Sequence, residues 1–156
     1  MGFRISSGMS LLAMTLAACA VEVIDPARPC ACINPYQGPT LEGFQAEAGD
    51  KIFFAYDKIE LTEDARRTLE KQAVWLRRYD KVRLRIEGHA DERGTRDYNL
   101  ALGERRATAQ MQYLVALGID PNRIETLSYG KERPAVPGDD EAAWAQNRRG
   151  VSIPQI

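Results

Sequence analysis

The sequence predicts an α/β domain in which two main helices pack on one face of a sheet, with the element order β-α-β-α-β-β. Three observations lead to this fold class. Apolar and charged side chains alternate over residues 82–87, and a second alternating stretch covers residues 123–129. Between them, apolar residues recur every three or four positions from about Asn99, which is the spacing of an amphipathic helix.

The first strand and the first helix precede this region. Residues 51–56 form a nearly continuous apolar run, which predicts a strand buried on both faces. Thr62 is suited to cap the following helix, and the basic pair Arg77 and Arg78 suits its negative C-terminal end. The stripe expected to face the sheet consists of Ala65, Leu69, Ala73 and Leu76.

The second strand ends at Gly88 and is followed by a loop, residues 89–97, that is dense in charged side chains. Loops of this kind usually carry function. The stripe that the next helix is expected to bury consists of Leu100, Gly103, Ala107, Met111 and Leu114. Arg106 lies on the flank of that stripe, so we expect its guanidinium to point toward the mouth of the loop.

The C-terminal third completes the sheet. A third strand over residues 123–129 is closed by Gly130, and residues 131–141 are polar and proline-containing, which indicates a surface loop. A short helical piece over residues 142–146 then leads into a last strand at residues 149–153. The folded domain is therefore expected to cover residues 49–156.

The N-terminal residues 1–18 have the features of a processing segment. Arg4 gives a positive start, and residues 9–16 form an apolar run that is too short to span a bilayer. The run Leu16-Ala17-Ala18-Cys19 resembles the bacterial lipobox, in which the cysteine is acylated and becomes the first mature residue. Two or three acyl chains anchor a protein stably. Ordinary cleavage that leaves a free Cys19 is the alternative.

Residues 19–48 are expected to form a lipidated N-terminus and a flexible tether, because they show no sustained period and contain several prolines. Ala20 follows the cysteine, and the absence of aspartate there favours the outer membrane over the inner one under the lipoprotein sorting rule. Cys30 and Cys32 leave a strained internal disulfide and an intermolecular one both open, whereas a soft-metal site needs more ligands.

Length and charge restrict the possible functions. The 156 residues fit one compact domain plus appendages, and 21 basic against 22 acidic side chains give a nearly neutral chain. This balance does not indicate a nucleic-acid-binding surface. Recognition is therefore expected at a local site.

The run GHADERGTRDYNLALGERRA, residues 88–107, together with Asn147-Arg148-Arg149, resembles the OmpA-like peptidoglycan-binding domain family. The resemblance covers about residues 49–153 and implies the same α/β sandwich with a mixed four-stranded sheet. It implies non-covalent binding of the diaminopimelate side chain in the peptidoglycan stem peptide. Asp91 and Arg106 match the aspartate and arginine that clamp this side chain in the family.

Other positions match the pocket of the family. Tyr56 and Asp57 match residues at the end of the first strand that line the pocket, and Leu102 matches an apolar wall position. Asn99 either holds the loop or touches the ligand.

Four further positions bear on the pocket without being assigned to it. Arg148 and Arg149 are expected to brace the closing strand rather than contact the ligand. The chain departs from the family pattern at Ala55, where an acidic residue is common, and at Gly150, where alanine is usual. These departures leave the loop near Asp57 less defined.

The clamp has a chemical rationale. Diaminopimelate ends in an ammonium and a carboxylate on one carbon, which require an acceptor-only anion and a planar donor fork. In the alternatives, Asp91 and Arg106 simply pair with each other, or Asp91 caps the following helix. Neither side chain lies in an apolar stripe, so Asp91→Ala and Arg106→Ala are both expected to keep the fold.

A metal-dependent periplasmic hydrolase is the catalytic alternative to this binding hypothesis. His89 and Asp91 could be metal ligands, or His89 a general base. However, a catalytic zinc site normally has a third protein ligand, and the sequence contains no Gly-x-Ser-x-Gly motif or P-loop. We therefore expect no enzyme activity, cofactor or metal, and we expect His89 to organise the strand end by hydrogen bonding.

The resemblance also implies cellular partners. It implies an outer-membrane lipoprotein of the Tol-Pal system whose periplasmic domain links the membrane to the cell wall, supporting envelope integrity and constriction during division. The periplasmic propeller protein of that system is the implied protein partner. A lipoprotein of an efflux, secretion or stress assembly is the alternative.

The processing motif gives a first prediction. We expect the mature chain to begin at an acylated Cys19 and to partition with outer-membrane fractions, because of the lipobox-like run and Ala20. Mass spectrometry of the N-terminal peptide is the measurement. An unmodified Cys19, or a mature chain that starts elsewhere, would contradict it.

Overall fold

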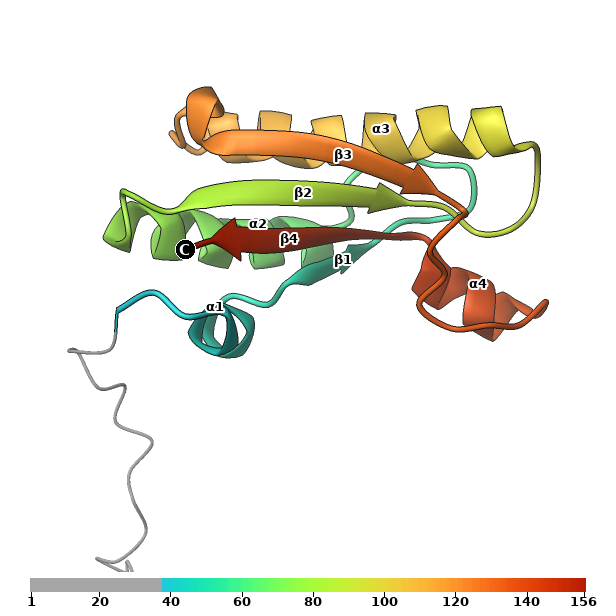
Figure 1. The fold of residues 1–156 in the computed structure, drawn as a ribbon, viewed down its shortest axis with the longest axis horizontal. Helices are drawn as coiled ribbons and strands as arrows, with labels where there is room; N and C mark the ends of the chain where they lie inside the picture. Colours follow the sequence, from blue (N-terminus) through green and yellow to red (C-terminus); the bar gives the residue numbers. More distant parts are fainter. Residues whose placement is uncertain (1–37) are drawn as a thin grey trace, which may run out of the picture. The chain divides into compact units, whose positions relative to one another are not determined.

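The computed structural model describes residues 38–156 (Figure 1). The expected processing segment, the acylated Cys19 and the pair Cys30 and Cys32 lie outside these residues. Within them, the elements follow the order α1-β1-α2-β2-α3-η1-β3-α4-β4. The predicted β-α-β-α-β-β core is therefore present, with additional helical pieces at the start and before the last strand.

The sheet has four strands in the order β1-β4-β2-β3. These strands are β1 (Lys51–Phe53), β2 (Arg83–His89), β3 (Ile124–Gly130) and β4 (Arg149–Gln155). The pair β2 and β3 is parallel, whereas β4 runs antiparallel to both β1 and β2. The predicted mixed α/β sheet is thus confirmed.

The two main helices, α2 (Glu63–Arg78) and α3 (Arg96–Ala116), lie behind the sheet in Figure 1. The Thr62 side chain accepts from the Ala65 backbone N–H, as predicted for an N-cap. Thr95 caps α3 in the same way, so this helix begins before Asn99 and the charged loop is shorter than expected. Among residues 38–156, no helix has the length and apolarity needed to cross a bilayer.

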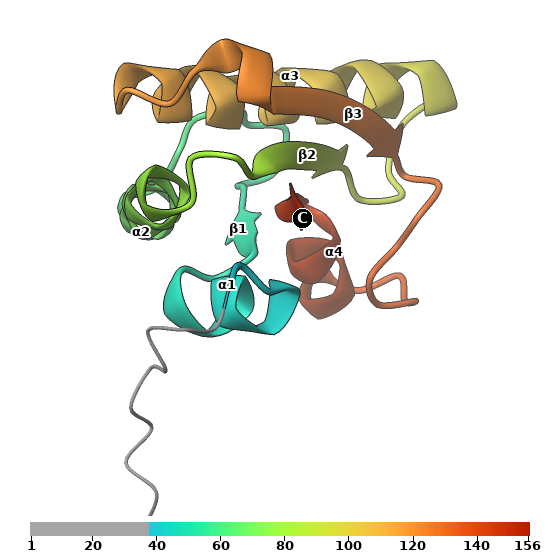
Figure 2. The same ribbon diagram turned by 60° about the vertical axis from the view of Figure 1, so that its left-hand side comes forward.

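The structure corrects the expected end of the tether. Helix α1 (Leu41–Glu47) forms where the sequence predicts irregular chain, and it lies at the β1 edge of the sheet (Figure 2). Its Phe44 is fully buried and packs edge-on against Trp75, with ring centroids 5.0 Å apart. A seven-residue helix with a single buried side chain has no apolar period that a sequence could reveal.

Strand β1 is also different from the prediction. It pairs only with β4 and therefore forms an edge of the sheet. Ile52 and Phe54 are buried, whereas Phe53 is 49% exposed. The apolar run therefore does not indicate burial on both faces, because alternate side chains of this edge strand are exposed.

The C-terminal elements agree with the prediction. Helix α4 (Glu141–Asn147) is the expected short helical piece, and its N-cap Asp140 accepts from the Ala143 N–H. A short 3-10 helix, η1 (Pro121–Arg123), leads into β3. The core between sheet and helices is filled by aliphatic side chains such as Leu69, Ile86 and Leu114.

The closest approach of α3 to the sheet occurs at two glycines. A Cβ atom at Gly88 of β2 would lie 1.9 Å from the carbonyl oxygen of Gly103 in α3. Backbone atoms of a helix cannot move aside to admit this Cβ atom, as the end of a flexible side chain could. The helix thus packs here directly on the strand, just before the charged loop.

We expect Gly88→Ala to lower the free energy of unfolding by about 1–3 kcal/mol or more, because helix and strand must separate to admit the methyl group. Urea denaturation measures this. Gly38→Ala is the control, since nothing lies within 4 Å of a Cβ at that position. Equal stability of the two variants would show that α3 shifts at little cost.

Candidate functional site

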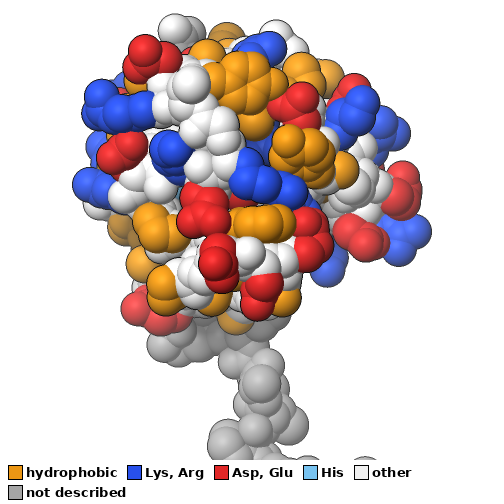
Figure 3. All heavy atoms as spheres, turned by 90° about the vertical axis from the view of Figure 1, so that its right-hand side faces the viewer, with side chains coloured by type: hydrophobic (Ala, Val, Ile, Leu, Met, Phe, Trp, Pro, Cys, Tyr) orange, Lys and Arg blue, Asp and Glu red, His pale blue; other side chains and the backbone are white. Residues whose placement is uncertain are grey.

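A cavity of about 200 Å³ opens where the loops after β1 and β2 meet the start of α3. All six residues predicted to bind line it: Tyr56, Asp57, Asp91, Asn99, Leu102 and Arg106. Figure 3 shows this end of the molecule, where basic, acidic and hydrophobic side chains lie close together. The structure therefore brings the predicted residues together, and their role in binding stays a prediction.

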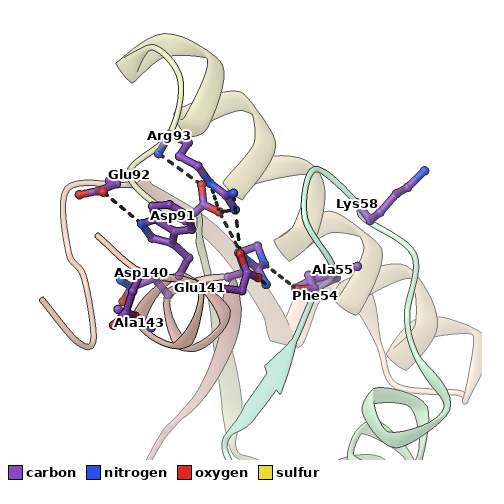
Figure 4. A network of polar contacts seen from close by, with 12 residues as sticks. Phe54, Ala55, Lys58, Asp91, Glu92, Arg93, Asp140, Glu141 and Ala143 are labelled. Carbon is purple, nitrogen blue, oxygen red and sulfur yellow. Dashed lines mark hydrogen bonds and ion pairs between the residues drawn. The ribbon is translucent and has the colours of Figure 1, made fainter. Parts of the chain in front are cut away.

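Asp91 follows β2 and is 5% exposed. Its Oδ2 accepts from Arg93 Nη2 at 2.5 Å, from Arg93 Nε at 3.2 Å and from Arg148 Nη1 at 3.3 Å (Figure 4). Its Oδ1 accepts from the Arg93 backbone N–H at 3.3 Å. Asp91 thus pairs with Arg93 and Arg148 rather than with Arg106, and the helix cap is Thr95. Both alternatives for Asp91 are therefore wrong.

Arg106 projects from α3 and is 0% exposed. Its guanidinium donates to three backbone carbonyls: Nε to Lys58 at 3.0 Å, Nη1 to His89 at 2.9 Å and Nη2 to Ala55 at 3.1 Å. It also lies over the Phe54 ring, 5.0 Å from the centroid. Arg106 therefore does not reach out to the loop mouth, but forms the floor of the cavity.

Burial has an electrostatic consequence for Arg106. Loss of solvation lowers the pKa of its guanidinium to about 10, against the opposing attraction of Asp91. The side chain therefore remains a cation at neutral pH. Two of its five N–H groups are not used by the three carbonyls, and the residue lines the cavity.

Arg148 lines the cavity as well, although the sequence assigned it to bracing. It donates to Asp91, to Glu141 Oε1 at 2.6 Å and to the Phe54 carbonyl at 3.2 Å. Its neighbour Arg149 does brace the chain, through the carbonyls of Arg133 and Asn147. The side chains of adjacent residues in an extended segment point to opposite sides, and no sequence signal shows which of the two arginines faces the cavity.

The rim is formed by residues after β1 and in the first turn of α3. Asp57 has a positive φ of 54°, and Tyr98 donates its hydroxyl hydrogen to the Asp57 carboxylate. This hydrogen bond raises the pKa of Tyr98. Asn99 is buried and donates to the Arg93 carbonyl at 2.9 Å, so it holds the loop, while Leu102 forms an apolar wall.

The two departures from the family pattern have structural explanations. Ala55 contributes its backbone carbonyl to Arg106, and a backbone group is present whatever the side chain. At Gly150 a Cβ atom would lie 1.7 Å from Nε2 of the buried Gln110, so the glutamine amide occupies that space. Neither departure removes a group that lines the cavity.

His89 is buried and is not among the residues that line the cavity. Its ring stacks on Tyr129 at 5.6 Å, and neither ring nitrogen has a hydrogen-bond partner among the described residues. Burial, with the positive charges of Arg149 and Arg133, lowers the pKa of His89 to about 4. The imidazole is therefore neutral, and the predicted hydrogen bonding at the strand end is wrong.

The structure also bears on the metal-site alternative. Across residues 38–156, no three His, Cys, Asp or Glu side chains are grouped so that they could hold a metal ion.

The contacts of Arg106 overturn the expectation that Arg106→Ala keeps the fold intact. Removing the guanidinium takes a donor from the buried contact at the His89 carbonyl and from the part-buried contacts at the Lys58 and Ala55 carbonyls, although the Ala55 carbonyl still accepts from the Lys58 backbone N–H. An unsatisfied buried carbonyl costs about 1–3 kcal/mol. We therefore expect a loss of about 1–3 kcal/mol or more in the free energy of unfolding, measured by urea denaturation.

The neighbouring Arg105→Ala is the matched control for this variant, because Arg105 is exposed and contacts only the Ala101 carbonyl within its own helix. We expect Arg105→Ala to unfold at nearly the wild-type urea concentration. A similar midpoint for Arg106→Ala would mean that the three carbonyls find other donors.

Comparisons with known proteins identify the family to which this chain is similar. The OmpA family model matches residues 53–148. A peptidoglycan-associated lipoprotein from Rhizobium meliloti (strain 1021) is 52% identical over 112 residues, which cover 72% of this chain and 64% of the relative. One from Pseudomonas putida is 42% identical over 149 residues, covering 88% and 89% of the two chains.

Solved structures agree. The crystal structure of the peptidoglycan-associated lipoprotein from Burkholderia pseudomallei superposes with a TM-score of 0.66 at 39% identity, over 68% of this chain and 90% of that one. The C-terminal domain of Helicobacter pylori MotB has a TM-score of 0.64 at 22% identity, over 69% and 84%, and shares the fold. The chain therefore belongs to the OmpA family and, within it, to the peptidoglycan-associated lipoproteins.

Proposed function

We propose that this protein binds peptidoglycan non-covalently, by taking the diaminopimelate side chain of a stem peptide into the cavity bounded by Asp91 and Arg106. The observation that carries the proposal is the presence, in one cavity of about 200 Å³, of a buried carboxylate and a buried guanidinium with unused N–H groups. The relatives are named peptidoglycan-associated lipoproteins, which supports peptidoglycan as the binding partner.

The ligand chemistry fits the cavity. An ammonium has three donors and no acceptor, and Asp91 is the buried carboxylate of the cavity. A carboxylate accepts well from a planar guanidinium, which Arg106 and Arg148 both provide. Leu102 supplies an apolar wall for the methylene chain. The role that we propose is one of binding rather than catalysis.

The proposal extends to the whole protein. The match spans 64% of the length of the Rhizobium relative. A role for the whole protein is therefore part of the proposal. That role is an acylated envelope protein anchored in the outer membrane, which links the membrane to the wall within the Tol-Pal system and meets the periplasmic propeller protein. The lipobox-like run ending at Cys19 supports it.

The decisive comparison uses two stem peptides, one with diaminopimelate and one with lysine. Lysine retains the ammonium and lacks the distal carboxylate. A charge-assisted hydrogen bond contributes about 1.5–3 kcal/mol, and 1.4 kcal/mol is tenfold in affinity. We therefore expect the mature chain, held in detergent, to bind the diaminopimelate peptide at least tenfold more tightly in titration calorimetry.

The variant Asp91→Asn provides a second test of the proposed function, because it keeps the shape of the side chain and removes its charge. Affinity for both peptides should fall by at least tenfold, since both carry the ammonium. Glu132→Gln is a control with the same chemical change, at an exposed residue whose partner is Arg96, outside the cavity. Equal affinity of the wild type for the two peptides would refute the proposal.

A further inference from the structure

The guanidinium of Arg93 is held between two aromatic rings at the cavity. Its central carbon lies 4.0 Å from the ring centroid of Tyr56 and 4.0 Å from that of Trp144. Tyr56 comes from the turn after β1 and Trp144 from α4, so three segments distant in sequence form this slot. The Trp144 ring is itself fixed, because its Nε1 donates to Glu92 at 3.0 Å. Two aromatic faces of this kind form a cation site.

Asp91 closes the end of the slot. Its Oδ2 receives two N–H groups from Arg93 and one from Arg148 (Figure 4). A carboxylate oxygen offers about two lone-pair positions, so Oδ2 already has more donors than it accommodates well. An ammonium can therefore pair with Oδ2 at full strength only after one of the two arginines has left, while Oδ1 accepts the Arg93 backbone N–H alone.

Arg93 is the one that can leave. Its side chain is 30% exposed, against 7% for Arg148. Arg148 is also anchored by the Phe54 carbonyl and by Glu141, whereas the other ionic contact of Arg93 is with Glu141 at 3.8 Å. Solvent next to the slot can receive the Arg93 guanidinium, but not that of Arg148.

We propose that Arg93 is a built-in occupant of the ammonium subsite, and that a ligand binds by displacing its guanidinium from Asp91 and from the slot between Tyr56 and Trp144. This inference rests on the proposed function and concerns the same cavity. Ligand-free molecules are then closed by their own side chain. The apparent affinity for any ammonium ligand is lowered by the fraction of molecules that are open.

Removal of the competitor is the first test. A chain that is closed about nine times in ten has its affinity lowered about tenfold. We expect Arg93→Ala to bind both the diaminopimelate and the lysine stem peptide about tenfold more tightly than wild type, by the same factor, because the competition is at the shared ammonium. Arg96→Ala is the charge-matched control, since Arg96 is 71% exposed and pairs with Glu132. It should bind as wild type does.

The fluorescence of Trp144 gives a readout that a change in stability would not mimic. The chain has two tryptophans, and the second, Trp75, is buried in the core. Adding the diaminopimelate peptide to wild type should remove the cation from the Trp144 ring and shift its emission. The shift should persist in Arg93→Lys, which keeps a cation, and be much smaller in Arg93→Ala.

The outcomes separate the two proposals. Wild type that binds the two peptides equally, or neither, contradicts the proposed function. If wild type prefers the diaminopimelate peptide but Arg93→Ala binds that peptide with unchanged or lower affinity, only the proposed role of Arg93 is overturned. If Arg93→Ala loses affinity for the diaminopimelate peptide and not for the lysine peptide, Arg93 holds the ligand carboxylate instead.

Discussion

The buried guanidinium of Arg106 holds together the end of the domain that carries the cavity. From α3 it reaches the carbonyls of Ala55 and Lys58 after β1 and the carbonyl of His89 at the end of β2. The hydrogen bond to His89 is buried, and those to Ala55 and Lys58 are part-buried. One side chain therefore fixes two loops against a helix, and under the proposed function the same group binds the carboxylate of the ligand.

Charges of both signs surround this floor. The guanidinium groups of Arg93, Arg106 and Arg148 and the carboxylates of Asp57 and Asp91 line the cavity, and Glu141 pairs with Arg93 and Arg148 from a more exposed position. Asp91 is the buried one of the two lining carboxylates. Acceptors and donors of opposite charge at one site suit a zwitterion better than a simple amine.

Much of this arrangement could be predicted from sequence, and the failures have physical causes. The Thr62 cap and the alternation of β2 are local patterns, and the structure confirms both. The stripe predicted for α3 is only partly right: Gly103, Ala107 and Leu114 are buried, but Leu100 is 44% exposed. Leu102, Arg106 and Gln110 are buried instead, because the helix turns the side that lines the cavity toward the sheet. Helix α1 was missed because it is stabilised by burying the single side chain of Phe44 against Trp75. The burial of β1 was overestimated because edge position in a sheet depends on pairing with β4, which comes last in the chain.

The sequence by itself determined the element types, the charged loop after β2 and the motif residues Asp91 and Arg106, because local periodicity and a specific run of residues carry that information. Only the tertiary structure decided which arginine meets which acceptor. Arg93, Arg106 and Arg148 are chemically identical, and their partners come from chain segments up to 94 residues away. Long-range packing makes Arg106 a buried donor to three carbonyls and Arg148 a fixed wall of the cavity. Arg93 instead pairs with Asp91 two positions away, and distant segments reach it through the rings of Tyr56 and Trp144.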